Sequence, residues 1–436
     1  MNDTIQKTTI NDFLFFLVVA GVPSSFFGLV NEKFFYIPGL FDLRLLSWLL
    51  SLLFLFFYFR NIKYIKNITA GNSLLWVVCF LAFVFLSTLL LNNVSFKEAF
   101  TIFRADYFTP ISCLALMLYM TTMDSVRLNR FFNWIILAMS VQGLFFIVYY
   151  FTGLSVFSVS IYETMDKARY FLAYPIFNSL VFNISVINLL FNKKIKWFAP
   201  LMISIVSMFL ISTRSVLFSY VIYLSIISFL YVFTGKKTKT MTMIYLFLML
   251  VTSQFIFSYY FKDYSDFFSE RLNEIFVSSS LKDVANYNFR LKLIDDAIQS
   301  NLINGTLLFG NGYVRFSESG DYDLTLGGDS SFAGVIYTEG VFGIIIRMLP
   351  IIIILIKNIK EYLFIRKEDT IPLNIISIAM IVPGIIMYAQ TAIFKNYNST
   401  VFFLFALEII KLKQGQYIDN NNHNKKPVNS VWNYQK

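Results

Sequence analysis

Long apolar runs, separated by short polar breaks, constrain this chain more than any other feature. Runs such as 13–29, 74–91 and 241–261 are close to the roughly 20 residues that an α-helix needs to cross a bilayer. Hydrophobic residues make up 57% of the chain and charged residues 14%, whereas a soluble domain carries about a quarter charged residues. We therefore predict an all-α polytopic membrane protein.

Apolar runs of bilayer-spanning length predict about twelve transmembrane helices. The expected spans are 13–30, 44–59, 74–91, 108–121, 131–151, 172–191, 197–211, 216–233, 241–261, 332–356, 371–393 and 398–412. Residues 1–260 thus hold nine spans, and residues 332–412 hold three. Between them lies a polar outer loop, 261–331, which contains a short helix. The last segment, 413–436, is rich in Asn and Lys and is expected to be a disordered tail.

Basic residues alternate between rich and poor breaks along the chain. The rich breaks carry Arg60, Lys63 and Lys66; Arg127 and Arg130; Lys193, Lys194 and Lys196; Lys236, Lys237 and Lys239; Lys357, Lys360, Arg366 and Lys367. Because basic residues favour the cytoplasmic side, both termini are expected in the cytoplasm of a bacterial cell. The outer loop then faces outward from the inner membrane, together with Arg104, Lys167, Arg169 and Arg214.

Several classes of function are disfavoured by composition. The net charge is +10, but the basic residues are dispersed and form no dense stripe, so nucleic acid is not an expected partner. Cys79 and Cys113 both lie within apolar runs, which favours buried thiols over a disulfide, and no metal-ligand spacing occurs. The sole histidine, His423, lies in the polar tail. No cofactor or metal is expected.

Two arginines in the outward-facing breaks are candidates for anion binding. Arg214 lies in the tight break Ser212-Thr213-Arg214-Ser215, either as a membrane-interface anchor or aimed at a cavity. Arg290 falls in the first turn of a helix predicted over 288–302, capped by Asn288 and ended by Asn304-Gly305. A bound anion would suit an arginine at that position, although a solvated surface arginine fits the spacing equally well. The helix's apolar stripe is Phe289, Leu293, Ala297 and Leu302, broadened by Ile294 and Ile298.

Four carboxylates follow this helix: Glu318, Asp321, Asp323 and Asp329. Their spacing does not match a calcium-binding loop, and Gly310-Asn311-Gly312 reads as a turn and not as a phosphate loop. Asp329 precedes the tenth span and is either a helix cap or a general base.

The tenth span contains two ionisable residues, Glu339 and Arg347, separated by about two helical turns. They share one helical face, which is expected to look into the bundle or a cavity. Gly340 and Gly343 would permit close packing with a neighbouring helix.

Taken together, these features resemble the O-antigen polymerases (Wzy-type) and the related O-antigen ligases. The matching stretches are Ser212-Thr213-Arg214-Ser215, Asn288-Phe289-Arg290, Leu308-Phe309-Gly310-Asn311-Gly312, Asp329, and Glu339-Gly340-Val341-Phe342-Gly343. The ligases use a histidine in the large loop. This chain has none there, which points to the polymerase branch.

The resemblance implies transfer of a growing glycan from undecaprenyl pyrophosphate to the non-reducing end of a lipid-linked repeat unit, as in lipopolysaccharide or capsule synthesis. Asp329 would be the base, and Arg214 and Arg290 would hold the diphosphate. The implied substrate-binding set is Arg104, Arg271, Tyr313, Asp321, Asp323, Glu339 and Arg347. Tyr313, Phe316 and Tyr322 would stack on sugars, and a chain-length regulator is a candidate partner beside membrane lipids. The alternatives are a lipid-linked oligosaccharide flippase or a ligase.

Overall fold

The computed structural model describes residues 43–92, 94–152, 159–164, 167–172, 175–192, 195–211, 214–232, 285–314, 331–365, 370–386 and 397–422. The predicted spans 13–30 and 241–261 lie outside these ranges. So do Arg271, Phe316, Glu318, Asp321, Tyr322, Asp323 and Asp329. The backbones of Arg104, Arg214 and Arg290 are described, but their side chains are not.

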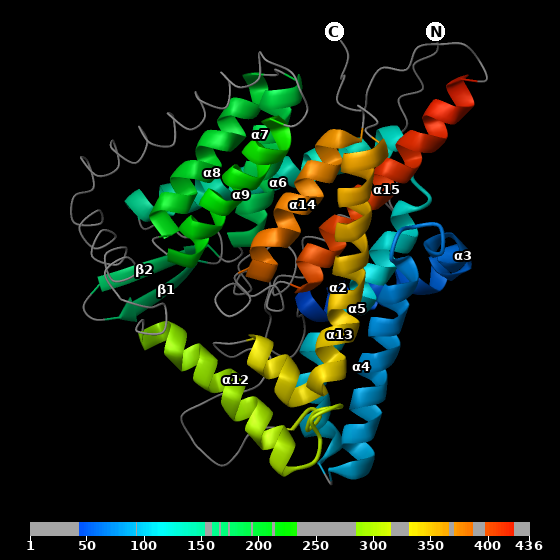
Figure 1. The fold of residues 1–436 in the computed structure, drawn as a ribbon, viewed down its shortest axis with the longest axis vertical. Coiled ribbons are helices and arrows are strands. Elements are labelled where there is room, and N and C mark those ends of the chain that lie inside the picture. Colours follow the sequence, from blue (N-terminus) through cyan, green and yellow to red (C-terminus); the bar gives the residue numbers. More distant parts are fainter. Residues whose placement is uncertain are drawn as a thin grey trace.

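Helices occupy the predicted spans throughout the described part of the chain (Figure 1). They are α2 (Leu43–Tyr58), α4 (Gly71–Leu91), α5 (Phe96–Met120), α6 (Ser125–Thr152), α7 (Pro175–Asn192), α8 (Phe198–Ile211), α9 (Arg214–Val232), α13 (Ser331–Lys360), α14 (Ile371–Ile386) and α15 (Tyr397–Asn422). Short elements join them: η2 (Phe59–Asn61), α3 (Ile62–Ile65), η3 (Ile195–Trp197) and the π-helical turn η5 (Glu361–Ile365). The helix α12 (Ala285–Ile303) lies in the predicted outer loop.

Three of the described helical stretches are long and apolar enough to cross a membrane: Gly71–Leu91, Ser125–Thr152 and Phe332–Phe364. Helix α4 shows why these stretches suit a bilayer. Its buried face carries Leu74, Val77, Leu81 and Val84, and its exposed face carries Trp76, Phe83, Leu86 and Leu90. A helix that is apolar on both its packed and its exposed face is stable when lipid covers the exposed face. The described helices therefore indicate a membrane protein.

The hairpin β1 (Val159–Thr164) and β2 (Lys167–Leu172) adds strands to the predicted all-α fold. The strands pair antiparallel, from Val159 opposite Leu172 to Thr164 opposite Lys167. Strand β1 is rich in β-branched residues, and β2 contains two aromatic residues, both types that favour strands. The hairpin packs against α6 and α8, and Figure 1 shows it on the side of the molecule where α12 lies.

Helix α13 contacts elements from both ends of the described chain. It packs against α4, α12, α14 and α15, and Figure 1 shows it running lengthwise between α4 and α14. Most buried apolar side chains of the described bundle form one continuous core. A smaller core fastens α12 to α13.

Helix ends account for two differences from the predicted boundaries. The fourth span begins earlier than expected because Ser95 caps α5, accepting a hydrogen bond from the Glu98 backbone N–H at 3.3 Å. Arg104 therefore lies within α5 and not in a break. The tail prediction is wrong for 413–422, since α15 continues to Asn422 and buries Gln414 after the predicted end of the span.

Candidate functional site

Helix α13 is broken at Gly340. This residue has φ 68° and ψ −165°, a conformation open essentially only to glycine. The break divides α13 into a first half, 331–339, and a second half, 341–360. Because a continuous helix would satisfy its own backbone groups, the break leaves donors and acceptors in need of partners.

The segment after α12, residues 304–313, supplies those partners; we name it the joint loop. Its carbonyls accept from the second half, and its N–H groups donate to the first half. The four bonds are Val341 N to Leu307 O (3.0 Å), Phe342 N to Leu308 O (3.1 Å), Asn311 N to Tyr337 O (2.7 Å) and Gly312 N to Thr338 O (3.0 Å). The joint loop thus completes the helix that the chain itself interrupts.

Close approach of the two backbones requires glycine on both sides. Gly310 has φ 73°, and a Cβ there would lie 2.4 Å from the Glu339 nitrogen. A Cβ on Gly340 would lie 2.5 Å from the Leu308 carbonyl carbon. The prediction that Gly340 and Gly343 admit a neighbouring helix is wrong. Gly340 admits the joint loop, and Gly343 admits the side chain of Glu339, whose Cβ lies 2.2 Å from the position of a Cβ at residue 343.

Asn311 is the polar centre of the joint loop. Its Nδ2 donates to Asn301 Oδ1 (2.7 Å) and Ser300 Oγ (3.3 Å) in α12. Its Oδ1 accepts from Thr306 Oγ1 (2.7 Å) and from Asn304 Nδ2 (3.0 Å). Its backbone carbonyl accepts from Asn92, at the end of α4, at 2.5 Å. The predicted turn at Gly310-Asn311-Gly312 therefore connects α12, α13 and α4.

Helix α12 ends as predicted, at Asn304-Gly305. Gly305 has φ 66°, and the N–H groups of Gly305 and Thr306 donate to the carbonyls of Leu302 (3.1 Å) and Asn301 (2.8 Å). This pair of bonds is a Schellman motif. It turns the chain from α12 directly into the joint loop.

The apolar face of α12 is fixed to the first half of α13. Leu293 and Ala297 pack with Ala333, Ile336 and Tyr337, and Ile294 and Ile298 lie at the edge of this core, as the predicted stripe requires. Asn301 Nδ2 also donates to the Ile336 carbonyl at 2.6 Å. Leu302 is exposed, so its assignment to the stripe is wrong.

The predicted location of Arg290 needs correction. Helix α12 begins at Ala285, not at Asn288, so Arg290 is its sixth residue and lies in the second turn. The first-turn argument for an anion therefore fails for Arg290. Position 290 precedes Leu293 by three residues and Ala297 by seven, a spacing that belongs to one helical face.

Tyr313 does not have the predicted sugar-stacking role. Its side chain is 0% exposed, and its ring meets that of Phe103 edge-on, with centroids 5.2 Å apart. Its backbone N–H donates to Thr88 Oγ1 at 3.0 Å. Tyr313 therefore anchors the end of the joint loop in the core between α4 and α5.

Glu339 and Arg347 face inward and bind each other, which confirms that they share a buried face. Arg347 Nε donates to Glu339 Oε2 at 2.8 Å, and Arg347 Nη2 donates to Glu339 Oε1. Both side chains are essentially inaccessible to solvent. In the described geometry these two predicted substrate-binding residues form a bidentate ion pair across the break in α13.

Among the other predicted site residues, Arg104 and Arg214 are known here by their backbone positions only. Arg214 is the first residue of α9. Arg104 follows Phe103, whose ring contacts Tyr313. Asp329 lies outside the described residues, two positions before the start of α13.

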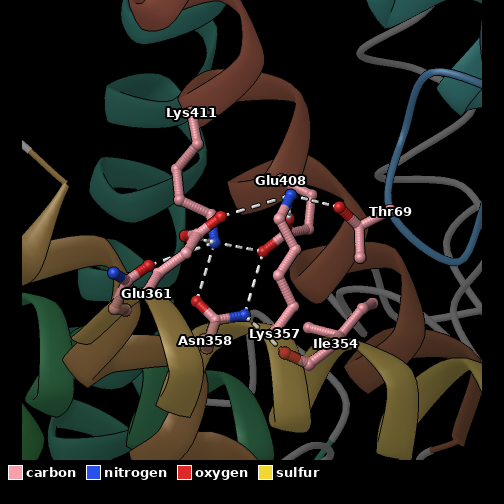
Figure 2. A network of polar contacts seen from close by, with 8 residues as sticks. Thr69, Ile354, Lys357, Asn358, Glu361, Glu408 and Lys411 are labelled. Atoms are coloured by element: carbon pink, nitrogen blue, oxygen red, sulfur yellow. Dashed lines mark hydrogen bonds and ion pairs between the residues drawn. The ribbon is translucent and has the colours of Figure 1, made fainter. Parts of the chain in front are cut away.

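A second polar group, which sequence reasoning missed, links α13, η5, α14 and α15 (Figure 2). We name it the ion cluster; its members are Lys357, Asn358, Glu361, Asn374, Glu408 and Lys411. Glu408 accepts from Lys411, from Lys357 at 3.1 Å and from Asn358 at 3.0 Å. The alternation of basic breaks had marked Lys357 only as a topology signal.

The ion cluster is balanced in charge, with two lysines and two glutamates. Lys411 also donates to Asn358 (2.7 Å) and Asn374 (3.1 Å) and lies 3.4 Å from Glu361. Lys357 pairs with Glu361 at 3.4 Å and donates to Thr69, next to α4. The carboxylate of Glu408 and the ammonium of Lys411 are buried, whereas Lys357 is partly exposed. The only sequence feature that marks the ion cluster is the spacing of Glu408 and Lys411, three residues apart at the end of an apolar run.

No family model and no curated protein matches this chain.

Proposed function

We propose that this protein is a polysaccharide polymerase that uses a lipid-linked glycan as donor. In the proposed reaction, the bond between the anomeric carbon of the donor and the diphosphate oxygen breaks. A bond forms between that carbon and a hydroxyl oxygen of the acceptor repeat unit. The hydroxyl proton passes to a carboxylate, and undecaprenyl diphosphate leaves with the electron pair.

The observation that supports this proposal most is the rigid attachment of α12 to α13. A polar helix within an otherwise apolar chain is fixed by an apolar core and by Asn311, and the joint loop that follows it makes four backbone bonds to α13. Figure 1 shows α12 beside the first half of α13 in the lower part of the view. Such an arrangement suits a site that must hold two glycan substrates in fixed relation at a membrane surface.

The roles of individual residues follow from their chemistry. Arginine binds phosphate oxygens through two parallel N–H donors, so Arg214 and Arg290 are proposed to bind and stabilise the leaving diphosphate. Asp329 is proposed as the base that takes the proton from the acceptor hydroxyl. Glu339 and Arg347 are proposed to support the site by holding the break in α13, and not to bind substrate.

The test is the length distribution of surface glycan in a deletion strain carrying plasmid-borne variants. Loss of an arginine that stabilises the leaving group is expected to lower chain extension by about 100-fold or more. Arg214→Ala and Arg290→Ala should then give single-repeat glycan at the cell surface. Lys292→Ala, an exposed cation on the same helix α12, is the matched control and should leave long chains. Membrane abundance of each variant is measured in parallel. Long chains in both arginine variants at normal abundance would refute the proposal.

The same deletion strain separates the alternatives. A flippase deletion traps repeat units on the cytoplasmic face, and a ligase deletion leaves polymer on its lipid carrier. The positions of the buried charged residues argue against the flippase. A transporter built from repeats would carry such residues in two similar halves of the chain. Among the described residues they all lie in α13 and α15: Glu339, Arg347, Glu408 and Lys411.

A further inference from the structure

The joint loop exposes apolar side chains in a segment that the sequence assigns to the aqueous outer loop. Leu308 is 54% exposed and Phe309 is 48% exposed. The ring of Phe309 stacks on that of Phe342 in α13, with centroids 5.2 Å apart, and meets that of Phe83 in α4 edge-on at 6.0 Å. Both partner rings are themselves exposed.

This surface continues the exposed faces of two candidate membrane spans. Exposed apolar residues follow one stripe of α4, at Trp76, Phe83, Leu86 and Leu90. They follow a stripe of α13 as well, at Val341, Phe342, Ile345, Leu349 and Ile352. Phe309 joins the two stripes. Because lipid would cover both helices, the same lipid layer would meet Phe309.

The depth of Phe309 can be estimated from α4. Phe83 lies eight residues before Leu91, the last residue of α4, which corresponds to roughly 12 Å along the helix axis. A ring in contact with Phe83 therefore lies well inside the layer that α4 spans.

Most backbone N–H groups of the joint loop are paired, as an apolar environment requires. Irregular backbone survives at membrane depth only where its polar groups are paired. Here Leu307 and Leu308 carbonyls accept from α13, the Asn311 carbonyl accepts from Asn92, and the N–H groups of Thr306, Phe309 and Gly310 donate within the loop and to the end of α12. The charged side chains of the described part of the outer loop lie on α12 and not on the joint loop.

We infer that the joint loop, around Leu308 and Phe309, is embedded in the hydrocarbon layer of the bilayer, with lipid acyl chains covering its exposed side chains. The embedded loop holds α12 at the membrane surface, at the level where the headgroups of lipids lie. This inference does not depend on the proposed glycan chemistry and holds for any function of the protein.

Site-directed spin labelling tests the inference in the full-length protein. Cys79, which is exposed, is replaced by alanine, and the buried Cys113 is retained. Single cysteines replace Leu308 or Phe309, with Leu86→Cys on α4 as the lipid reference and Lys292→Cys on α12 as the water reference. Each labelled variant is reconstituted into phosphatidylcholine nanodiscs, and its collision rates with oxygen and with a water-soluble nickel chelate are measured.

The expected ratio of oxygen to nickel collisions at Leu308 and Phe309 equals that at Leu86 and exceeds that at Lys292 several-fold. A ratio at both loop positions equal to that at Lys292 would overturn the inference. Only variants that give the same monodisperse chromatographic peak as the parent protein, and are therefore folded, are scored. If Phe309→Cys disturbs the ring stack, Leu308→Cys, at the more exposed position, decides the outcome alone.

Discussion

Removal of the Glu408 carboxylate is the sharpest test of the buried electrostatics. Glu408→Gln keeps the shape of the side chain and leaves two ammonium groups, Lys357 and Lys411, facing one carboxylate, Glu361. Glu408 and Lys411 are only 2% and 7% exposed, so solvent cannot compensate the uncancelled charge. Removal of one partner from a buried pair costs about 3–5 kcal/mol. For a chain of 436 residues, this corresponds in thermal unfolding to a midpoint lower by about 3–5 °C.

The double variant Glu408→Gln with Lys411→Met separates charge balance from packing. It removes the two buried charges together. Lys357 stays paired with Glu361, with its Nζ 3.4 Å from Glu361 Oε1. We expect the double variant to unfold at a higher temperature than Glu408→Gln alone. Lys357→Met is the matched single control and should cost less than Glu408→Gln, since the Lys357 side chain is 39% exposed. Midpoints are measured on detergent-purified protein by the loss of the monodisperse chromatographic peak on heating. A double variant no more stable than Glu408→Gln alone would contradict the reasoning.

Two further predictions concern the break in α13. Glu339→Gln leaves the buried guanidinium of Arg347 without its carboxylate, so the same unfolding assay should show a loss of about 3–5 kcal/mol; a midpoint unchanged from the parent would show that the pair is not needed. Gly310→Ala should destabilise the protein much more than Gly305→Ala. Both glycines have positive φ, which costs an alanine about 1–2 kcal/mol, but only the Cβ at Gly310 meets backbone, 2.4 Å from the Glu339 nitrogen, whereas that at Gly305 meets nothing within 4 Å. Equal midpoints for the two glycine variants would contradict the described contact.

The helices were predictable because each depends on a local property. The length and apolar character of a run predict a spanning helix without reference to any partner, and Asn304-Gly305 ends α12 through bonds within six residues. The inward orientation of Glu339 and Arg347 was predicted from helical spacing, but their ion pair joins two helical segments across the break at Gly340 and does not run along one continuous helix. The apolar stripe at Leu293 and Ala297 was found for the same reason.

The break at Gly340 was not predictable because its cause lies far away in the chain. Within an apolar run, Glu339-Gly340-Val341 reads as continuous helix, and only the joint loop, about thirty residues earlier, provides the hydrogen bonds that make a break tolerable. The burial of Tyr313 follows from the same joint, since an aromatic residue in a polar loop gives no sign of a pocket between α4 and α5. The ion cluster was missed because Lys357 and Glu361 look like an ordinary helix end until α15 brings Glu408 and Lys411 beside them.

The joint loop also limits how the outer loop can work. Movement of α12 away from the bundle would break its core with α13, and movement of the joint loop with it would also break the four backbone bonds that this loop makes to α13. In a membrane, the released N–H and C=O groups would have no water to bind, which makes such an opening costly. A lid that closes over substrate through motion of α12 is therefore disfavoured by the described contacts. Any site that includes position 290 would therefore be largely formed before a ligand arrives.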